Sequence, residues 1–202
     1  TAAAAARARL SCVLVLGGQP PDKAPTGNLL LDTLLGAEIR WTGHHRRGEE
    51  LERVADELRA AGRRPYVIPY GGSNALGAAA YALAMHELAA QLSDNPPLDG
   101  IDRIIVASSS GATQAGLVVG ARRVGYRGQI LGIAIDKGEA GDDPYPVHLA
   151  RLASATARLL QMDEAFTPED FVINRDYLGG GYGVVGAAER EAIHLAGRCE
   201  GL

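Results

Sequence analysis

Short apolar runs alternate with longer segments of helical periodicity along this chain. The runs with the length and β-branched content of strands are 12–16, 38–41, 66–68, 103–107, 130–135 and 171–173. The segments whose apolar residues recur with helical spacing are 1–10, 28–35, 48–61, 74–92, 113–124, 146–161 and 186–197. This alternation is typical of βαβ units and predicts an α/β fold. Several runs are apolar at every position, as parallel strands buried on both faces are.

Two glycine-rich breaks divide the chain. Between Tyr70 and Ser73 a predicted strand passes through two glycines into an alanine-rich helix, which is the composition of a hinge. We therefore expect a smaller α/β domain over residues 1–70 and part of a larger one over residues 71–202. Residues 138–146 are rich in Gly, Asp and Pro and predict a surface loop. The predicted fold is two open, twisted, mainly parallel sheets flanked by helices.

Composition and charge narrow the classes of protein. Of 202 residues, 47% are hydrophobic and 22% charged, as in a globular chain. A net charge of −4 with mixed signs argues against nucleic acid or an anionic membrane as the main partner. No apolar run reaches the roughly 18 residues of a membrane helix, and the start lacks the charge order of a secretory signal. Cys12 and Cys199 lack metal-ligand spacing, so we expect packing roles and a reduced, cytoplasmic location.

The stretch from Ile104 to Gly116 carries the clearest chemical signal: a buried strand, a loop of small residues, and a helix. Its centre, residues 108–113, reads Ser-Ser-Ser-Gly-Ala-Thr and is called the glycine loop below. Small side chains let main-chain N–H groups converge, and the helix points its positive dipole end at the loop, so an anion such as phosphate would suit it. The alternative is a plain strand-to-helix turn capped by Thr113. Dinucleotide and P-loop sites are disfavoured because the glycine spacing is wrong and Leu117 stands where a P-loop needs lysine.

Several segments together resemble one known family. They are Ser108-Ser-Ser-Gly-Ala-Thr-Gln-Ala-Gly116, Tyr66-Val-Ile-Pro-Tyr-Gly-Gly-Ser-Asn-Ala-Leu-Gly77, Tyr177-Leu-Gly-Gly-Gly-Tyr-Gly183 and residues 20–41. Each is similar to a segment of the pyridoxal-phosphate (PLP) enzymes of the tryptophan-synthase-β fold, nearest the group of D-cysteine desulfhydrase and 1-aminocyclopropane-1-carboxylate (ACC) deaminase. The resemblance covers nearly the whole chain and implies PLP as the cofactor. It also implies that the phosphate is held by Ser110, Gly111, Ala112 and Thr113.

The same resemblance implies a substrate site. Ser73 would contact the substrate carboxylate and act in catalysis, with Asn74 beside it. Tyr182, between glycines that let the backbone approach a ligand, is the candidate active-site phenol and can orient a carboxylate or pass a proton. Two plainer alternatives stay open, namely that Ser73 caps the following helix and that Tyr182 packs its ring under a loop.

The lysine that forms the internal aldimine in PLP enzymes has no good candidate here. The chain has only Lys23, in a polar proline-rich loop, and Lys137, which polar loop residues follow. The family places its lysine upstream of the helix that residues 1–10 resemble, and nothing precedes Thr1 to cap that helix. We therefore expect that the natural protein extends beyond both ends, and that the chain as given does not turn over substrate.

The resemblance implies a PLP-dependent lyase or deaminase that acts on a small amino acid. Gly-Gly-Ser-Asn at 71–74 favours a D-cysteine desulfhydrase, which yields pyruvate, sulfide and ammonia, over an ACC deaminase, which yields 2-oxobutyrate and ammonia. An L-cysteate sulfo-lyase and a non-catalytic remnant that binds a small anion stay open. The family also implies a homodimer. No metal is expected, because His44 and His45 stand in a loop without a third ligand.

Overall fold

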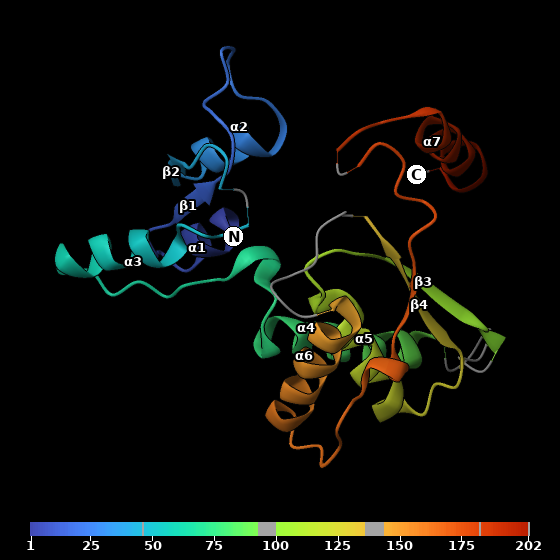
Figure 1. Ribbon diagram of the computed structural model, residues 1–202. Helices are drawn as coiled ribbons and strands as arrows, with labels where there is room; N and C mark the ends of the chain where they lie inside the picture. The colour runs from blue at the N-terminus through green and yellow to red at the C-terminus, as the bar shows by residue number, and fades with distance from the viewer. Residues whose placement is uncertain (46, 93–99, 136–143, 182, 202) are drawn as a thin grey trace. The chain divides into compact units, whose positions relative to one another are not determined.

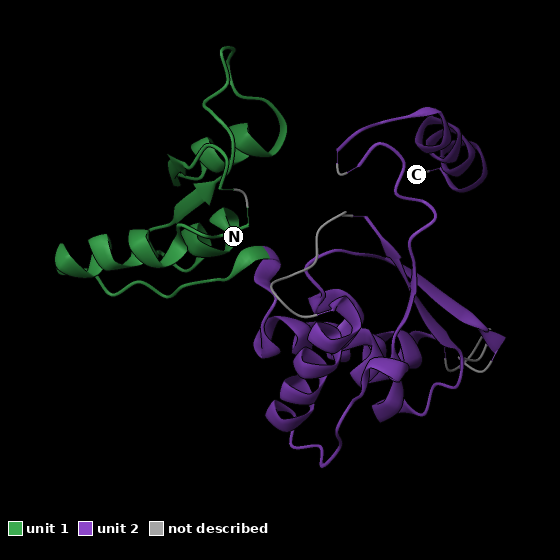
Figure 2. Ribbon diagram, in the orientation of Figure 1, with its two compact units in different colours: residues 1–70 green, residues 71–202 purple. Residues whose placement is uncertain are grey.

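The chain forms two compact units in the computed structural model, which describes residues 1–45, 47–92, 100–135, 144–181 and 183–201. Unit 1 covers Thr1–Tyr70 and unit 2 covers Gly71–Leu202 (Figure 2). Each unit contains one parallel sheet with helices beside it (Figure 1). The predicted α/β fold with two parallel sheets is therefore confirmed. That unit 1 is a smaller domain and unit 2 is part of a larger one stays a prediction.

Unit 1 is built around a two-stranded sheet. Its strands β1 (Val13–Leu16) and β2 (Glu38–Trp41) pair in parallel, with Val13 opposite Glu38 and Leu16 opposite Trp41. Helix α3 buries one face, made of Val54, Ala55 and Leu58, because these residues lie within about one turn of each other. On the polar side, Arg40 of β2 forms an ion pair of 2.7 Å with Glu57 of α3. The helices of this unit are α1 (Ala2–Arg7), α2 (Gly27–Leu34) and α3 (Leu51–Ala60).

The strand predicted at 66–68 is wrong. Residues 63–69 form neither helix nor strand, and Tyr66 and Ile68 are 72% and 44% exposed. Pro65 and Pro69 flank the run and have no N–H group to donate to a neighbouring strand. A three-residue apolar run has the same composition in an extended connection as in a strand. Only hydrogen bonds to a neighbouring strand distinguish the two, and these residues form none with the described strands.

Unit 2 is built on a three-stranded parallel sheet in the order β3-β4-β5. Ile104 of β3 lies opposite Ile130 of β4, and Leu131 of β4 lies opposite Val172 of β5. The strands are β3 (Arg103–Ser108), β4 (Gln129–Ala134) and β5 (Val172–Asn174). The helices are α4 (Ala75–Gln91), α5 (Ala112–Val124), α6 (Tyr145–Leu159) and α7 (Ala187–Glu200), with a short 3₁₀ turn at Pro168–Asp170. A second 3₁₀ turn, Tyr70–Gly72, includes the last residue of unit 1 and the first two of unit 2.

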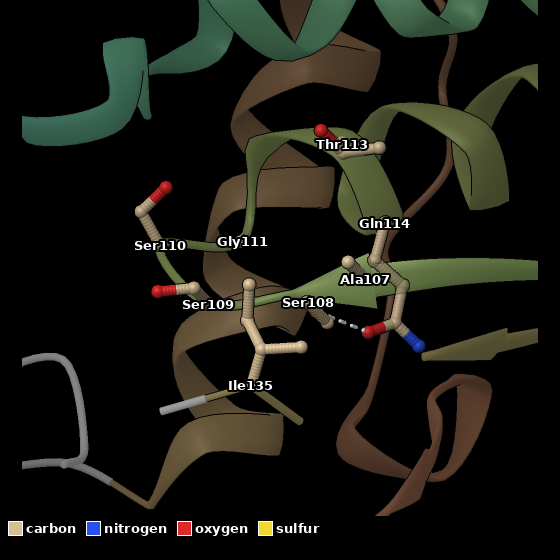
Figure 3. A pocket seen from close by; sticks show the side chains of 8 residues that line it. All are labelled: Ala107, Ser108, Ser109, Ser110, Gly111, Thr113, Gln114 and Ile135. Carbon is tan, nitrogen blue, oxygen red and sulfur yellow. Dashed lines mark hydrogen bonds between the residues drawn. The ribbon is translucent and has the colours of Figure 1, made fainter. Parts of the chain in front are cut away.

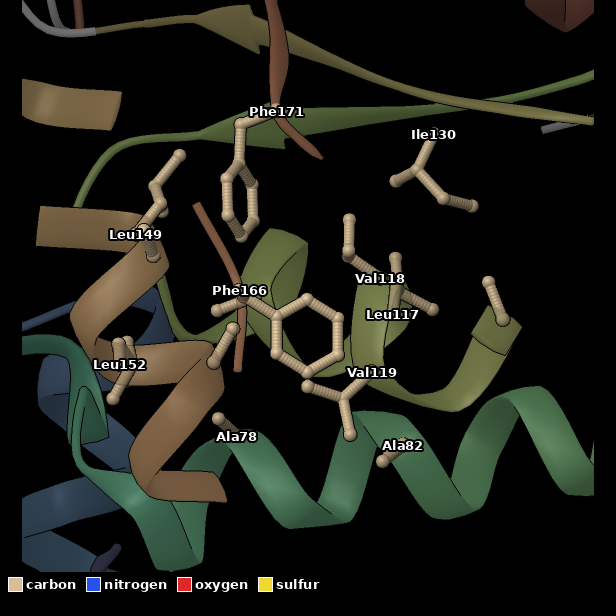
Figure 4. Close-up of a cluster of buried hydrophobic side chains, with 14 of the residues drawn as sticks. Ala78, Ala82, Leu117, Val118, Val119, Ile130, Leu149, Leu152, Phe166 and Phe171 are labelled. Carbon is tan, nitrogen blue, oxygen red and sulfur yellow. The ribbon is translucent and has the colours of Figure 1, made fainter. Parts of the chain in front are cut away.

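One face of the unit 2 sheet carries the core (Figure 4). Ile104 and Val106 of β3 point to it with Ile130 of β4, as the alternation of side chains along a strand requires. Helices α4, α5 and α6 pack on one another, and α5 contacts both β3 and β4. On the other face Ile105 is 61% exposed and Val172 39% exposed. The described residues therefore cover only one face of strands whose composition suits burial on both.

Helices α4 and α5 approach closely because α5 carries glycines where they meet. A Cβ atom at Gly120 would lie 2.7 Å from the carbonyl oxygen of Ala82, and one at Gly116 would overlap the carbonyl oxygen of Ala78. Ala78 and Ala82 are themselves buried and small. This close packing fixes the position of α5, and with it the position of the glycine loop at its N-terminus.

The predicted helices are confirmed in position, with shifts at their ends. The first ends at Arg7 rather than Leu10, and Arg9 takes a left-handed φ of 56° that stops helical continuation. The last runs to Glu200 rather than Gly197. None of the described helices combines the length and the apolar character needed to cross a membrane.

Candidate functional site

A pocket of about 170 Å³ lies where β3 ends and α5 begins (Figure 3). This is the carboxyl edge of a parallel sheet, where open α/β proteins bind their ligands. The described residues that line it carry no charged side chain: Ala107, Ser108, Ser109, Ser110, Gly111, Thr113, Gln114 and Ile135.

Gly111 makes the turn from strand to helix. Its φ of 103° lies in the left-handed region that other residues avoid, and it is the N-cap residue of α5. A Cβ atom at this position would lie 2.8 Å from Cδ2 of Leu149 on α6. Backbone conformation and space therefore both favour glycine. The alternative in which Thr113 caps α5 is wrong, because Thr113 lies inside the helix.

The glycine loop leaves main-chain donors unused. Among the described residues, no acceptor takes a hydrogen bond from the N–H groups of Ser110, Gly111, Thr113 or Gln114, whereas Ala112 N–H donates to the Ser73 hydroxyl at 3.2 Å. Gly111 and Gln114 are buried, and a buried N–H group without a partner costs about 1–3 kcal/mol. The positive end of the α5 dipole lies at the same loop and also attracts negative charge. The arrangement therefore suits an anion that accepts several hydrogen bonds.

The turn at residues 71–73 lies against the glycine loop. Gly71 and Gly72 have φ of 63° and 64°, which turns the chain sharply before α4. A Cβ atom at Gly71 would overlap Oγ of Ser110, and the Ser73 hydroxyl accepts the N–H of Ala112. Two sequence motifs that lie well apart along the chain, the glycine loop and the Gly-Gly-Ser-Asn turn, therefore meet in space.

Asn74, rather than Ser73, caps the helix that follows. Its side-chain oxygen accepts the N–H of Gly77 at 2.8 Å, and it is the N-cap residue of α4. The alternative of a helix-capping Ser73 is therefore wrong. The Ser73 hydroxyl keeps its own O–H as a donor, because in its bond with Ala112 the hydroxyl oxygen is the acceptor.

Below the pocket, a buried polar network ties the loop to its surroundings. The Ser108 hydroxyl lies 2.8 Å from Oε1 of Gln114 and 2.8 Å from the phenol oxygen of Tyr145, and Gln114 Nε2 donates to the carbonyl of Val172 at 2.9 Å. His148, one turn after Tyr145 on α6, places Nε2 3.1 Å from the carbonyl oxygen of Ser110. These contacts connect the loop to α6 at Ser108 and Ser110, and Gln114, just after the loop, to β5.

The sequence alone did not predict this network. The only local signal was the i, i+3 spacing of Tyr145 and His148, which puts both on one face of a helix. Nothing in that spacing indicates which loop the face contacts.

The remaining candidates from the sequence are Tyr182, the two lysines and the pair His44–His45. Tyr182 and Lys137 lie outside the described residues. Lys23 is exposed in unit 1. His45 pairs through Nδ1 with Glu50 at 2.6 Å. Within the described ranges, no group of three or more His, Cys, Asp or Glu residues is placed to hold a metal ion.

Comparisons with known proteins agree with one another. A family model described as pyridoxal-phosphate dependent enzyme matches residues 1–202. D-cysteine desulfhydrase of Yersinia enterocolitica serotype O:8 / biotype 1B is 31% identical over 207 residues, which cover 100% of this chain and 60% of that protein. The crystal structure of an ACC deaminase homologue superposes with a TM-score of 0.81 at 31% identity, over 98% of this chain and 57% of the other. The chain therefore spans less than two thirds of the length of these relatives.

Proposed function

Since this chain belongs to the pyridoxal-phosphate dependent enzymes, we propose that it is part of a lyase or deaminase that acts on a small amino acid. The first candidate is a D-cysteine desulfhydrase, which releases pyruvate, sulfide and ammonia. PLP, when bound, supplies an electron sink for breaking bonds at the α-carbon of the amino acid.

The observation that carries this proposal is the set of unused main-chain donors at the glycine loop. The pocket has room for a phosphate group, and Ser110, Gly111 and Thr113 each present an N–H group without a partner among the described residues. A phosphate monoester dianion offers three oxygens, each able to accept several such bonds. We propose that these residues, with Ala112, hold the phosphate of PLP. Ala112 N–H would then be shared between the phosphate and Ser73.

Ser73 is the proposed contact for the substrate carboxylate. Its oxygen already accepts from Ala112, so its remaining O–H can donate to a carboxylate beside the glycine loop. Asn74 uses its side-chain oxygen to cap α4, which leaves the amide N–H groups for a ligand. We propose Tyr182 as the phenol that completes this site, on the strength of its glycine-flanked sequence.

The choice of substrate rests on two observations. The Gly-Gly-Ser-Asn turn and the similarity to a D-cysteine desulfhydrase favour D-cysteine. The structural similarity to an ACC deaminase homologue favours ACC as the second candidate. L-cysteate, and a non-catalytic role in anion binding, are further alternatives. We also propose a homodimer in the cytoplasm.

The cofactor site is tested by calorimetry with pyridoxine 5′-phosphate and with pyridoxine. Neither compound has an aldehyde, so neither forms a bond with an amine, and only the phosphate differs. We expect the phosphate to raise the affinity at least about tenfold, because several charge-assisted hydrogen bonds are each worth about 1.5–3 kcal/mol. Equal affinity for the two compounds would refute the assignment of the glycine loop.

The substrate is tested with the protein extended to the length of its relatives and loaded with PLP. Pyruvate from D-cysteine without 2-oxobutyrate from ACC supports the desulfhydrase, and the opposite result supports the deaminase. Release of pyruvate and sulfite from L-cysteate supports the sulfo-lyase. No product from any of the three, in a protein that binds pyridoxine 5′-phosphate, supports the non-catalytic alternative.

A further inference from the structure

His148 reaches the glycine loop from the side of α6. Its Nε2 lies 3.1 Å from the carbonyl oxygen of Ser110. A carbonyl oxygen can only accept a hydrogen bond, so the ring nitrogen must carry the proton and donate it. This is a bond from a helix side chain to the peptide unit that joins Ser110 to Gly111.

That bond fixes the direction of a neighbouring N–H group. In a planar trans peptide the C=O and the N–H point in opposite directions, so the Ser110 carbonyl and the Gly111 N–H face opposite sides of the loop. With the carbonyl held toward His148, the N–H of Gly111 points away from α6 and has no partner among the described residues.

The bond from His148 to Ser110 is important because a glycine follows Ser110. Because Gly111 has no Cβ, it accepts positive and negative φ about equally, and the Ser110–Gly111 peptide can turn over at little cost. The turned peptide would present the Ser110 carbonyl oxygen where the Gly111 N–H now points. This oxygen carries a partial negative charge and would repel a bound anion. The hydrogen bond from His148 to the Ser110 carbonyl therefore favours the peptide orientation in which the Gly111 N–H can donate to an anion.

The His148 ring is itself held in place. It stacks on Tyr145, with ring centroids 6.2 Å apart and planes 14° from parallel. Tyr145 is only 4% exposed, and its phenol oxygen lies 2.8 Å from the Ser108 hydroxyl. One turn of α6 therefore contacts the glycine loop at both Ser108 and Ser110.

We propose that His148 is a positioning residue for the phosphate site: it holds the Ser110–Gly111 peptide with its N–H directed to the anion. This inference rests on the proposed function, namely that the glycine loop binds the phosphate of PLP. His148 itself does not touch the phosphate, so its effect on binding passes through one peptide unit.

The test compares His148→Phe with His148→Gln in the full 202-residue chain. Phenylalanine keeps an aromatic ring next to Tyr145 and loses the donor, whereas glutamine loses the ring and keeps an N–H close to the position of Nε2. The probes are pyridoxine 5′-phosphate and pyridoxine, measured by calorimetry. His86→Phe, at an exposed position of α4, is the matched control.

We expect His148→Phe to weaken binding of pyridoxine 5′-phosphate about fivefold, the range of one hydrogen bond, and to leave pyridoxine unaffected. His148→Gln should restore most of the phosphate affinity, and His86→Phe should change neither ligand. If the wild-type chain discriminates the two ligands but His148→Phe does so equally well, the positioning role is refuted while the phosphate site stands. If the phenylalanine variant binds normally and the glutamine variant does not, the ring acts by packing alone and the proposal is also wrong. If the wild-type chain does not discriminate them, the proposed function fails, and this inference with it.

Discussion

Gly111 combines a left-handed backbone conformation with a close contact to Leu149, and both disfavour a larger residue. Replacing it with alanine places a Cβ at a φ of 103° and 2.8 Å from Leu149 Cδ2. We expect Gly111→Ala to lower the free energy of unfolding by about 1–3 kcal/mol and to weaken binding of pyridoxine 5′-phosphate, because the loop must shift. Urea unfolding and calorimetry measure the two effects.

Gly125→Ala is the matched control for this substitution. Gly125 has a φ of 73°, but a Cβ there would meet nothing within 4 Å. It should lose only about 1 kcal/mol of stability from the backbone and bind the phosphate ligand as the wild-type chain does. If Gly111→Ala also keeps full phosphate affinity, the amides of the glycine loop are not the anion site.

At the scale of residues, the sequence predicted features that consecutive positions determine and missed contacts between residues far apart in the chain. The small residues of the glycine loop and the unusual turn at 71–73 show their chemistry in a few consecutive positions. Asn74 as the cap of α4, in place of Ser73, depends on where the helix begins, which a sequence fixes only to within a few residues. The bond from His148 to Ser110 joins two elements whose packing no local pattern encodes.

Among the helices, the contact between α4 and α5 is the one that most constrains the pocket. Alanine in place of a helical glycine normally stabilises by up to about 1 kcal/mol, but at Gly116 the new methyl group would overlap the carbonyl oxygen of Ala78. Overpacking costs about 1–3 kcal/mol, so the clash prevails. We expect Gly116→Ala to lower the free energy of unfolding by about 1–2 kcal/mol in a urea titration.

Arg123→Ala, at an exposed position of the same helix, should change the unfolding free energy by less than about 0.5 kcal/mol. A gain of stability for Gly116→Ala would show that α4 and α5 leave room for a methyl group. The inference that α5 needs glycine to pack against α4 would then be refuted.

For elements, the success of sequence reasoning followed their length. The long helices have enough turns for periodicity to identify them, and their positions are confirmed. The three-residue run at 66–68 has no periodicity to read, and its flanking prolines outweighed its apolar content. Exposure of Ile105 likewise shows that composition reports what a strand can bury, not what covers it in this chain.

Across the whole molecule, the two units differ in how much apolar surface they bury. In the described part of unit 1 the buried hydrophobic residues are Ala2, Val54, Ala55 and Leu58, whereas unit 2 has a continuous cluster that joins its sheet to α5 and α6. Local opening is easiest where few apolar contacts must be broken. We expect amides of β1 and β2 to exchange with solvent deuterium at least about tenfold faster than those of β4.

Hydrogen exchange followed by mass spectrometry measures this difference. Equal protection of β1 and β4 would mean that the units open together as one cooperative structure, against the division at residues 70 and 71.

The alternation of strands and helices was enough to predict the fold class of the whole chain, and the motifs were enough to predict its family. Both conclusions depend on patterns repeated over many residues, so errors in single elements did not affect them. Substrate choice is different, because it depends on a few side chains around one ligand and not on a pattern repeated along the chain.

The proposed phosphate site is composed of peptide groups, and this has an evolutionary consequence. Every amino acid except proline supplies the same N–H group. The identities of residues 110–114 can therefore change among small residues while the main-chain donors remain. If this proposal holds, we expect selection to act mainly on the bend at Gly111 and on His148, the side chain that contacts the loop there. Related proteins are then expected to differ in substrate while they keep the same main-chain contacts to the cofactor phosphate.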